Sequence, residues 1–252
     1  MKKRTVLPSI YCFSISFNSI IDLSDRKESD GVCFKCTNII KVSMKKCIIF
    51  DMDGTLWDSS ASVLAAGNEV IEKKLGIKNY LNQDIMNQVM GLEIEEIADI
   101  YFPQLNRDER LKLTLECLEN ENKYISKHGG ILYEGVEETL EKLSQKHDLM
   151  IVTNAQDGYV EAMFAAHPLK KYFKDYETHG RTGLVKGENI KLIMRRNHYD
   201  HAYYVGDTMK DFEACEFAGI PMIYASYGFG KVEKAWKTIN RFSELLDLFE
   251  GM

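Results

Sequence analysis

The feature that most constrains the fold is an apolar run that ends in two closely spaced carboxylates. Residues 47–50 read Cys-Ile-Ile-Phe, and Asp-Met-Asp-Gly-Thr follows directly as residues 51–55. A short, wholly apolar run is typical of a strand that is covered on both faces of a parallel sheet. The two acids would then lie beyond the carboxyl end of that strand, where open α/β sheets bind their ligands. The sequence therefore predicts an α/β fold with reactive groups at this edge.

From Met44 onward the chain alternates strand and helix signals. The strand candidates are short and mostly apolar, and the segments between them have the apolar spacing of helices, with several bounded by glycine or proline. We expect strands at 46–50, 149–153, 203–206 and 221–224, and helices at 136–146, 159–166, 188–196 and 211–218. Because such alternation implies βαβ units, the predicted fold is α/β, with a Rossmann-like parallel sheet core and helices on both faces.

One long gap interrupts this alternation. About 95 residues separate Asp53 from the next predicted strand, whereas a single crossover needs only about a dozen. Apolar residues in the gap recur at three- and four-residue spacing, which predicts helices at 62–75, 82–90, 93–101 and 107–128. We therefore expect an inserted all-helical cap domain at 59–130 and an α/β core domain formed by 44–58 and 131–252. A cap over the carboxylates can exclude water from them.

The first 43 residues differ from the rest. They begin with the basic residues 2–4 and continue through a Ser-rich, partly apolar stretch. Ser and Asn interrupt that stretch and no clean cleavage site follows, which argues against a secretory signal. Met44 stands directly before the first predicted strand, at a natural translation start. We therefore interpret residues 1–43 as an N-terminal extension that is disordered and lies outside the fold.

Charge and cysteine content limit the partners. The net charge is −6 at pH 7, although residues 1–46 carry nine Lys and Arg against four Asp and Glu. The acidic remainder argues against nucleic acid as a partner, and no segment approaches the roughly 20 apolar residues of a membrane span. Cys33 and Cys36 form the one CxxC pair among six cysteines. With no second pair or His cluster, we expect reduced thiols in a cytoplasmic protein rather than a zinc site.

Four motifs occur in order at predicted strand ends or helix starts. They are residues 51–55, the pair Thr153-Asn154, Lys186, and Gly-Asp-Thr-Met-Lys-Asp at 206–211. Each alone has an ordinary explanation, such as a turn or a solvated lysine, but turn chemistry rarely produces all four together. In this order they resemble the haloacid dehalogenase-like hydrolase superfamily, over essentially the whole chain after Met44. A helical insertion directly after the first motif is similar to the helical-cap branch, which includes phosphoglycolate phosphatases.

This resemblance implies a phosphohydrolase. The substrate would be a small-molecule phosphate monoester, such as a phosphoglycolate-like ester, a sugar phosphate or a nucleotide, cleaved through an aspartyl-phosphate intermediate. Asp51 would be the nucleophile, and Asp53 would protonate the leaving alkoxide and then activate water. Thr153 and Lys186 would complete the catalytic set, and these two with Asn154 would hold the phosphoryl oxygens.

The implied cofactor is Mg²⁺. This hard cation prefers carboxylates, carbonyl oxygens, waters and substrate phosphate as ligands. Its expected ligands are Asp51, the backbone carbonyl of Asp53, and Asp207. Asp211 would support the metal site from behind these ligands, four residues further along the same helical face. The cation would also let an acidic pocket accept an anionic substrate.

Two assignments depend on the match to the family. Gly91 and Leu92 resemble a loop of the cap, and we expect them to contact the substrate. Lys186 precedes a predicted helix start, as the corresponding family lysine does, although proline often follows that lysine in relatives and Gly187 follows it here. Nearby lysines compete for the assignment, namely Lys170, Lys171, Lys174 and Lys191.

Three other functions fit the same scaffold. A phosphomutase would use the same aspartates but return the phosphoryl group to a bound sugar. A phosphonate hydrolase would need a Schiff-base lysine in the cap, for which Lys73, Lys74 and Lys78 are candidates. A non-catalytic regulatory binding protein is the third, and the intact acids and lysine argue against it. We expect the protein to act as a monomer or homodimer, without nucleic acid or a membrane as partner.

Overall fold

The core is a parallel sheet whose strand order brings the predicted motifs together. The computed structural model describes residues 46–250. Its six-stranded sheet has the order β5-β4-β1-β6-β7-β8, and every neighbouring pair is parallel. The strands are β1 (Cys47–Phe50), β4 (Asp148–Thr153), β5 (Phe173–Thr178), β6 (Ala202–Gly206), β7 (Met222–Ala225) and β8 (Lys237–Ile239). Since β1 lies between β4 and β6, the carboxyl ends of these three strands are neighbours.

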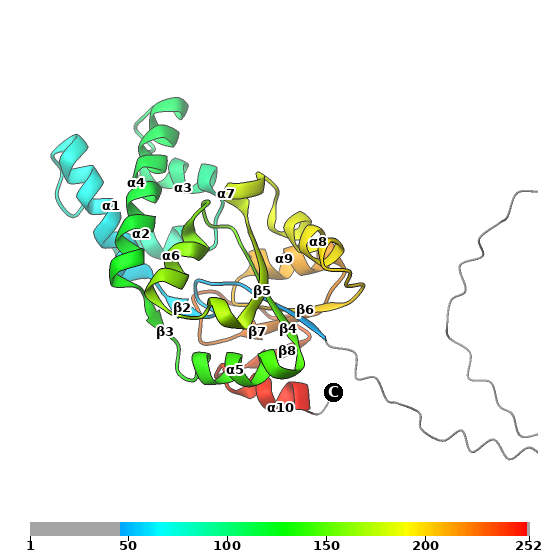
Figure 1. The fold of residues 1–252 in the computed structure, drawn as a ribbon. Coiled ribbons are helices and arrows are strands. Elements are labelled where there is room, and N and C mark those ends of the chain that lie inside the picture. The colour runs from blue at the N-terminus through cyan, green and yellow to red at the C-terminus, as the bar shows by residue number, and fades with distance from the viewer. Residues whose placement is uncertain (1–45, 251–252) are drawn as a thin grey trace, which may run out of the picture. The chain divides into compact units, whose positions relative to one another are not determined.

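Helices cover both faces of this sheet (Figure 1). On β1, Ile48 and Phe50 belong to one apolar cluster and Cys47 and Ile49 to the other, because successive side chains of a strand point to opposite faces. The first cluster includes residues of α5 (Val136–Lys146), α6 (Tyr159–Ala166) and α10 (Glu244–Glu250), and the second includes residues of α8 (Lys186–Arg196) and α9 (Met209–Ala218). The predicted α/β fold class is confirmed.

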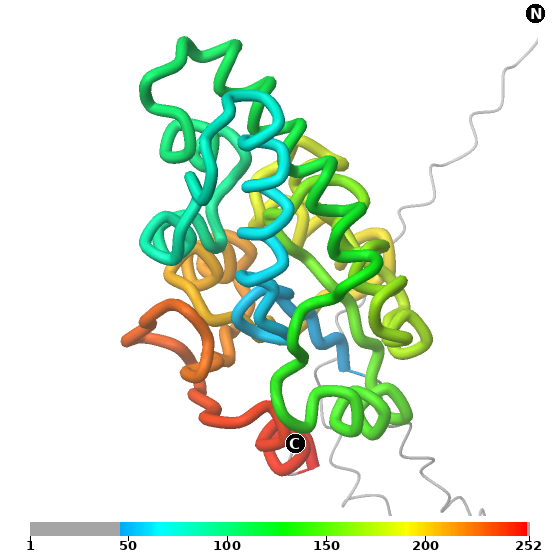
Figure 2. Tube along the Cα trace, turned by 90° about the vertical axis from the view of Figure 1, so that its left-hand side faces the viewer, coloured from blue at the N-terminus to red at the C-terminus, as the bar shows by residue number. Residues whose placement is uncertain are grey.

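A helical insertion leaves and re-enters the core through a short ribbon. Strand β2 (Trp57–Asp58) pairs antiparallel with β3 (Ile131–Leu132). Between them run α1 (Ser60–Leu75), α2 (Gln83–Val89), α3 (Ile94–Tyr101) and α4 (Arg107–His128). Figure 2 shows α1 and α4 side by side along their length. The predicted helices occur here within two residues of their expected bounds, and treating 59–130 as a separate domain stays a prediction.

Several elements were not predicted from the sequence. Strand β5 is rich in charged residues and β8 has three residues, so neither has the apolar run expected of a covered strand. The other unpredicted elements are β2, β3, the single-turn helix α7 (His179–Thr182), the 3₁₀ turn Lys170–Tyr172 and α10. Apart from α10, which packs on one face of the sheet, they lie at the sheet edges, in the ribbon and in connections.

Some sequence predictions concern residues 1–45 or 251–252 and lie outside the described residues. These are the extension at 1–43 and the cysteines before Cys47. Within 46–250, Cys47, Cys117 and Cys215 are buried free thiols. None of the helices in the described range is long and apolar enough to cross a membrane.

Candidate active site

Three adjacent strand ends supply the polar side chains of the candidate site. Asp51 directly follows β1, Thr153 ends β4, and Asp207 follows β6. The Asp51 N–H donates to the Val205 carbonyl at 2.9 Å, which continues the sheet pairing and fixes where the carboxylate emerges. Asp51, Thr153 and Asp207 are all at most 4% exposed. Buried polar groups concentrated at one sheet edge are typical of a ligand site in this fold class.

Lys186 provides the positive charge at this edge. It is the first residue of α8 and is 3% exposed. Its Nζ lies 3.1 Å from Asp51 Oδ1 and 2.6 Å from Asp211 Oδ1. Burial opposes the charge on Lys186, but Asp211 and Asp51 outweigh that effect and raise its pKa above the ordinary value. Lys186 therefore stays protonated between two carboxylates.

The competing lysines lie at the surface. Lys171 pairs with Glu137 and Lys174 with Asp148, and Lys191 lies over the ring of Phe217. Lys170 is also exposed. Of the lysines considered from the sequence, Lys186 is the one that the structure places beside Asp51.

Asp211 is held by hydrogen bonds that leave Asp207 free to bind a ligand. Asp211 Oδ2 accepts from the N–H groups of Asp207 and Thr208 and from the Thr208 hydroxyl, within a capping box that starts α9. With Lys186 on its other oxygen, Asp211 is saturated. Asp207 Oδ2 accepts from the Phe229 N–H at 2.7 Å, whereas Asp207 Oδ1 is buried with no hydrogen-bond partner. A buried acceptor without a partner is rare and points to a missing ligand.

These acids fit a divalent cation. Carboxylate oxygens of Asp51, Asp207 and Asp211 lie within 4.8 Å of one another, and since Asp211 is already hydrogen-bonded on both oxygens, Asp51 and Asp207 would be the direct ligands. Burial, followed by repulsion from Asp211 and Asp51, raises the pKa of Asp207 to about 8, and burial likewise raises the pKa of Asp51. Gly54, at φ +78°, lies against Asp207, and a Cβ at this position would collide with the Asp207 carboxylate. Excess buried negative charge and an all-oxygen donor set are what Mg²⁺ sites require.

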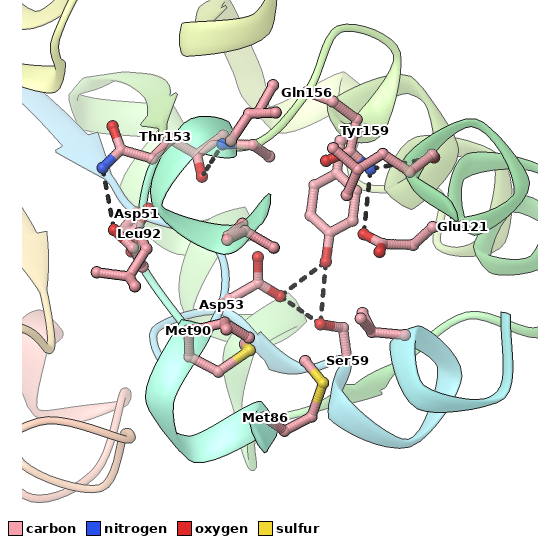
Figure 3. Close-up of a pocket in the computed structure, with 18 of the residues that line it drawn as sticks. Asp51, Asp53, Ser59, Met86, Met90, Leu92, Glu121, Thr153, Gln156 and Tyr159 are labelled. Atoms are coloured by element: carbon pink, nitrogen blue, oxygen red, sulfur yellow. Dashed lines mark hydrogen bonds between the residues drawn. The ribbon is translucent and has the colours of Figure 1, made fainter. Parts of the chain in front are cut away.

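Asp53 points to a different part of the site. Its Oδ1 accepts hydrogen bonds from the Ser59 hydroxyl and, at 2.9 Å, from the Tyr159 hydroxyl (Figure 3). Ser59 precedes the first helix of the insertion and Tyr159 begins α6, so groups from both sides orient this carboxylate. The Asp53 side chain thus lies in the pocket between insertion and core, outside the cluster formed by Asp51, Asp207 and Asp211.

This pocket lies between the insertion and the end of the sheet and encloses about 60 Å³. The predicted residues Gly91 and Leu92 line it together with Thr153 and Asn154. The Asn154 side-chain amide donates to the Gly91 carbonyl at 3.0 Å, which ties the insertion to the core at the pocket. Its remaining wall is largely apolar, made by Val63, Met86, Val89, Met90, Ile94, Ile97, Tyr101, Leu118 and Ala155.

Sequence reasoning missed the polar residues on the far side of this pocket. Glu121 of α4 and Gln156, two residues after Asn154, both line it, and the Gln156 amide donates to Glu121 Oε1 at 3.1 Å. Glu121 lies on the buried face of α4, at helical spacing from Leu118 and Ile125. A carboxylate within an apolar helical stripe is the signal that could have found it.

Comparison with known proteins agrees with this geometry. The haloacid dehalogenase-like hydrolase profile matches residues 48–225. A phosphoglycolate phosphatase of Aquifex aeolicus is 26% identical over 82% of this chain and 97% of its own length.

Solved structures share the fold. A haloacid dehalogenase-superfamily hydrolase from Geobacter sulfurreducens has a TM-score of 0.62 at 22% identity, over 81% of this chain and 96% of its own. CbbY from Rhodobacter sphaeroides, solved in complex with phosphate, has a TM-score of 0.66 at 20% identity, over 80% of this chain and 96% of its own. Since the profile spans well over half of the sequence and contains all four motifs, the chain belongs to the haloacid dehalogenase-like hydrolase family.

Proposed function

We propose that the protein is a Mg²⁺-dependent phosphatase that hydrolyses a small-molecule phosphate monoester through an aspartyl-phosphate. The observation that carries this proposal is the placement of two acids two residues apart. Asp51 lies beside Lys186 and the Asp207 cluster, whereas Asp53 faces the pocket under the insertion. One acid is positioned for attack at phosphorus and the other for proton transfer to the departing alcohol.

The reaction would proceed in two displacements. An Asp51 oxygen attacks phosphorus, the bond from phosphorus to the ester oxygen breaks, and Asp53 gives its proton to that oxygen. Water then attacks phosphorus while Asp53 takes its proton, and the bond to Asp51 breaks to restore the carboxylate and release phosphate. Lys186, Thr153 and the Asn154 N–H would stabilise the phosphoryl oxygens as charge develops on them.

Asp51, Asp207 and the Asp53 carbonyl would hold Mg²⁺, and Asp211 would position Asp207 and Lys186. When bound, the cation neutralises phosphate charge and thereby permits attack by an anionic carboxylate. The hydrogen bonds from Ser59 and Tyr159 hold the Asp53 carboxyl toward the leaving group. They oppose the effect of burial, which raises the Asp53 pKa above its ordinary value and favours the protonated acid.

The phosphonate-hydrolase alternative lacks support in the described residues. Lys74 and Lys78 form surface ion pairs with Glu116 and Glu72, and Lys73 is exposed. None of these lysines lines the pocket, so the pocket lacks the Schiff-base lysine that phosphonate hydrolysis needs. A phosphomutase would use the same geometry, and measurement of free phosphate separates it from a phosphatase.

The test is phosphate release from an aryl phosphate with Mg²⁺, comparing wild type with Asp51→Asn. We expect activity below detection in the variant, because an amide cannot form the intermediate. Asp99→Asn is the control, since this exposed acid pairs with Arg110 on the insertion surface. Borohydride quenching during turnover should label residue 51 of the wild type. Unchanged phosphate release in Asp51→Asn would refute the proposal.

A further inference from the structure

The side of the pocket away from Lys186 carries a buried acid that the reaction does not use. Glu121 lies in α4, is 6% exposed and faces the same space as Asp53. Its carboxylate accepts a hydrogen bond from the Gln156 amide, which also donates to Asn122 Oδ1. Figure 3 shows Glu121 beside Gln156, across the pocket from Met86 and Met90. A leaving alcohol held near Asp53 would therefore extend toward Glu121.

Within residues 46–250, this space is lined by acids and by no cationic side chain. The lining residues include the acids Asp51, Asp53 and Glu121 and, within the described chain, no Lys, Arg or His. The nearest catalytic cation, Lys186, is held between Asp51 and Asp211 on the phosphate side. The other walls are mostly aliphatic or thioether side chains, which do not stabilise a second anion.

A substrate with a carboxylate on its alcohol would thus meet an unfavourable environment. Its carboxylate would be desolvated next to Glu121 with no cation to pair with, and a buried unpaired charge is strongly disfavoured. A hydroxyl could instead exchange hydrogen bonds with Glu121 or Gln156, and an ammonium group could pair with the Glu121 carboxylate. The small enclosed volume favours a leaving group of a few heavy atoms.

We propose that Glu121 makes this pocket select small phosphate esters whose alcohol is neutral or cationic, bearing a hydroxyl or ammonium group, and discriminate against carboxylate-bearing alcohols. The inference rests on the proposed phosphatase function and narrows its substrate class. The proposed preference excludes phosphoglycolate, the substrate after which the phosphoglycolate phosphatase relatives are named. Glu121 acts as a specificity residue and takes no part in phosphoryl transfer.

Three two-carbon esters of nearly equal size test the proposal on the wild-type protein. They are 2-hydroxyethyl phosphate, O-phosphoethanolamine and 2-phosphoglycolate, assayed for phosphate release with saturating Mg²⁺ at pH 9, where Glu121 is charged because burial raises its pKa only to about 8. We expect kcat/KM for each of the first two to exceed that for phosphoglycolate at least tenfold. A phosphoglycolate value equal to or above the other two would overturn the inference but leave the phosphatase function intact. Failure to release phosphate from all three esters and an aryl phosphate would instead reject the proposed function.

Variants of Glu121 assign the selectivity to this side chain. In Glu121→Gln, which can still accept from Gln156, we expect the ratio of kcat/KM for phosphoglycolate over hydroxyethyl phosphate to rise at least fivefold. In Glu121→Asp, which keeps the charge, the ratio should stay near the wild-type value. Thermal melting checks that both variants fold, and the wild-type ester series remains decisive if either does not. An unchanged ratio in folded Glu121→Gln would remove Glu121 from the proposed role.

Discussion

At the scale of single residues, the burial of Glu121 makes stability depend on pH. Burial raises the pKa of Glu121 to about 8. The hydrogen bond from Gln156 lowers this pKa, and the negative charge on Asp53 raises it further. The unfolded chain has an ordinary value of 4.5, so the folded state binds this proton more tightly. The stabilisation from Glu121 is therefore complete below about pH 4.5 and is lost as the pH rises toward 8.

We predict that Glu121→Gln removes the loss of stability that ionisation of Glu121 causes as the pH rises. The free energy of unfolding of the variant, relative to wild type, should increase between pH 5 and pH 8 by a few kcal/mol, on the order of 1.4 per unit of pKa shift. Urea denaturation at several pH values measures it, and taking the difference between the two proteins cancels the titration of the other acids. Glu109→Gln, which replaces an exposed acid at the start of the same helix, is the control. A difference between Glu121→Gln and wild type that does not change with pH would contradict the prediction.

At the scale of elements, the insertion packs on the core through α4 against α6, and polar contacts of α3 add to this packing. Lys210 of α9 pairs with Glu96 of α3 at 2.9 Å, and both side chains are about two-fifths exposed. Nearby, His179 Nε2 lies 3.7 Å from Glu95 Oε2. An exposed ion pair such as that of Lys210 with Glu96 stabilises by about 0.2–1 kcal/mol. The Lys210 pair is therefore a small part of what holds the insertion closed over the core.

We predict that Lys210→Met weakens this closure and lowers kcat/KM up to about fivefold at low salt, in line with the energy of one exposed pair. The difference from wild type should shrink at high ionic strength, because salt screens the pair in the wild type. Lys123→Met is the matched control, since Lys123 pairs with Glu119 within α4 and does not join insertion to core. Equal effects of the two variants would show that closure does not depend on the Lys210 pair.

Elements with one dominant signal were predictable, and those defined by distant contacts were not. Strand β1 was found because all four of its residues are apolar and buried. Strand β5 was missed because Lys174, Asp175 and Glu177 interrupt its apolar pattern, and Glu177 is buried through ion pairs with Arg181 and Arg196. Its charges are satisfied by residues that only the fold brings near.

The same distinction applies to the site. Motifs that follow strand ends can be read along the chain, and the structure gathers Asp51, Lys186 and Asp207 from them. The hydrogen bond of Tyr159 with Asp53 joins residues 106 positions apart in the sequence. The hydrogen bond of Gln156 with Glu121 joins residues 35 positions apart. Neither pair has a local pattern, so these two contacts required the structure.

At the scale of the whole molecule, binding of a cation at the sheet edge should stabilise the entire fold. The ligand groups follow β1 and β6 in the centre of the sheet, and a ligand that binds the native state alone adds stability by mass action, about 2.7 kcal/mol at one hundred times its Kd. We predict that Mg²⁺ raises the melting temperature of the EDTA-treated wild type. EDTA should also abolish phosphate release.

Asp207→Asn should fold but show no such rise, because the variant lacks the carboxylate whose Oδ1 is without a partner. Thermal unfolding with and without Mg²⁺ provides the measurement, and Asp99→Asn should keep the full wild-type response. A Mg²⁺ response that persists in Asp207→Asn would place the cation elsewhere.

The ribbon formed by β2 and β3 brings the two ends of the insertion together. Since the insertion departs after Asp58 and returns at Ile131, directly opposite in the pairing, its two attachment points are adjacent. Segments of other lengths and shapes could be grafted between the same two strands without altering the order of the central sheet. Evolution or engineering could thus exchange the insertion while Asp51 and Asp207 remain in place at the end of the sheet.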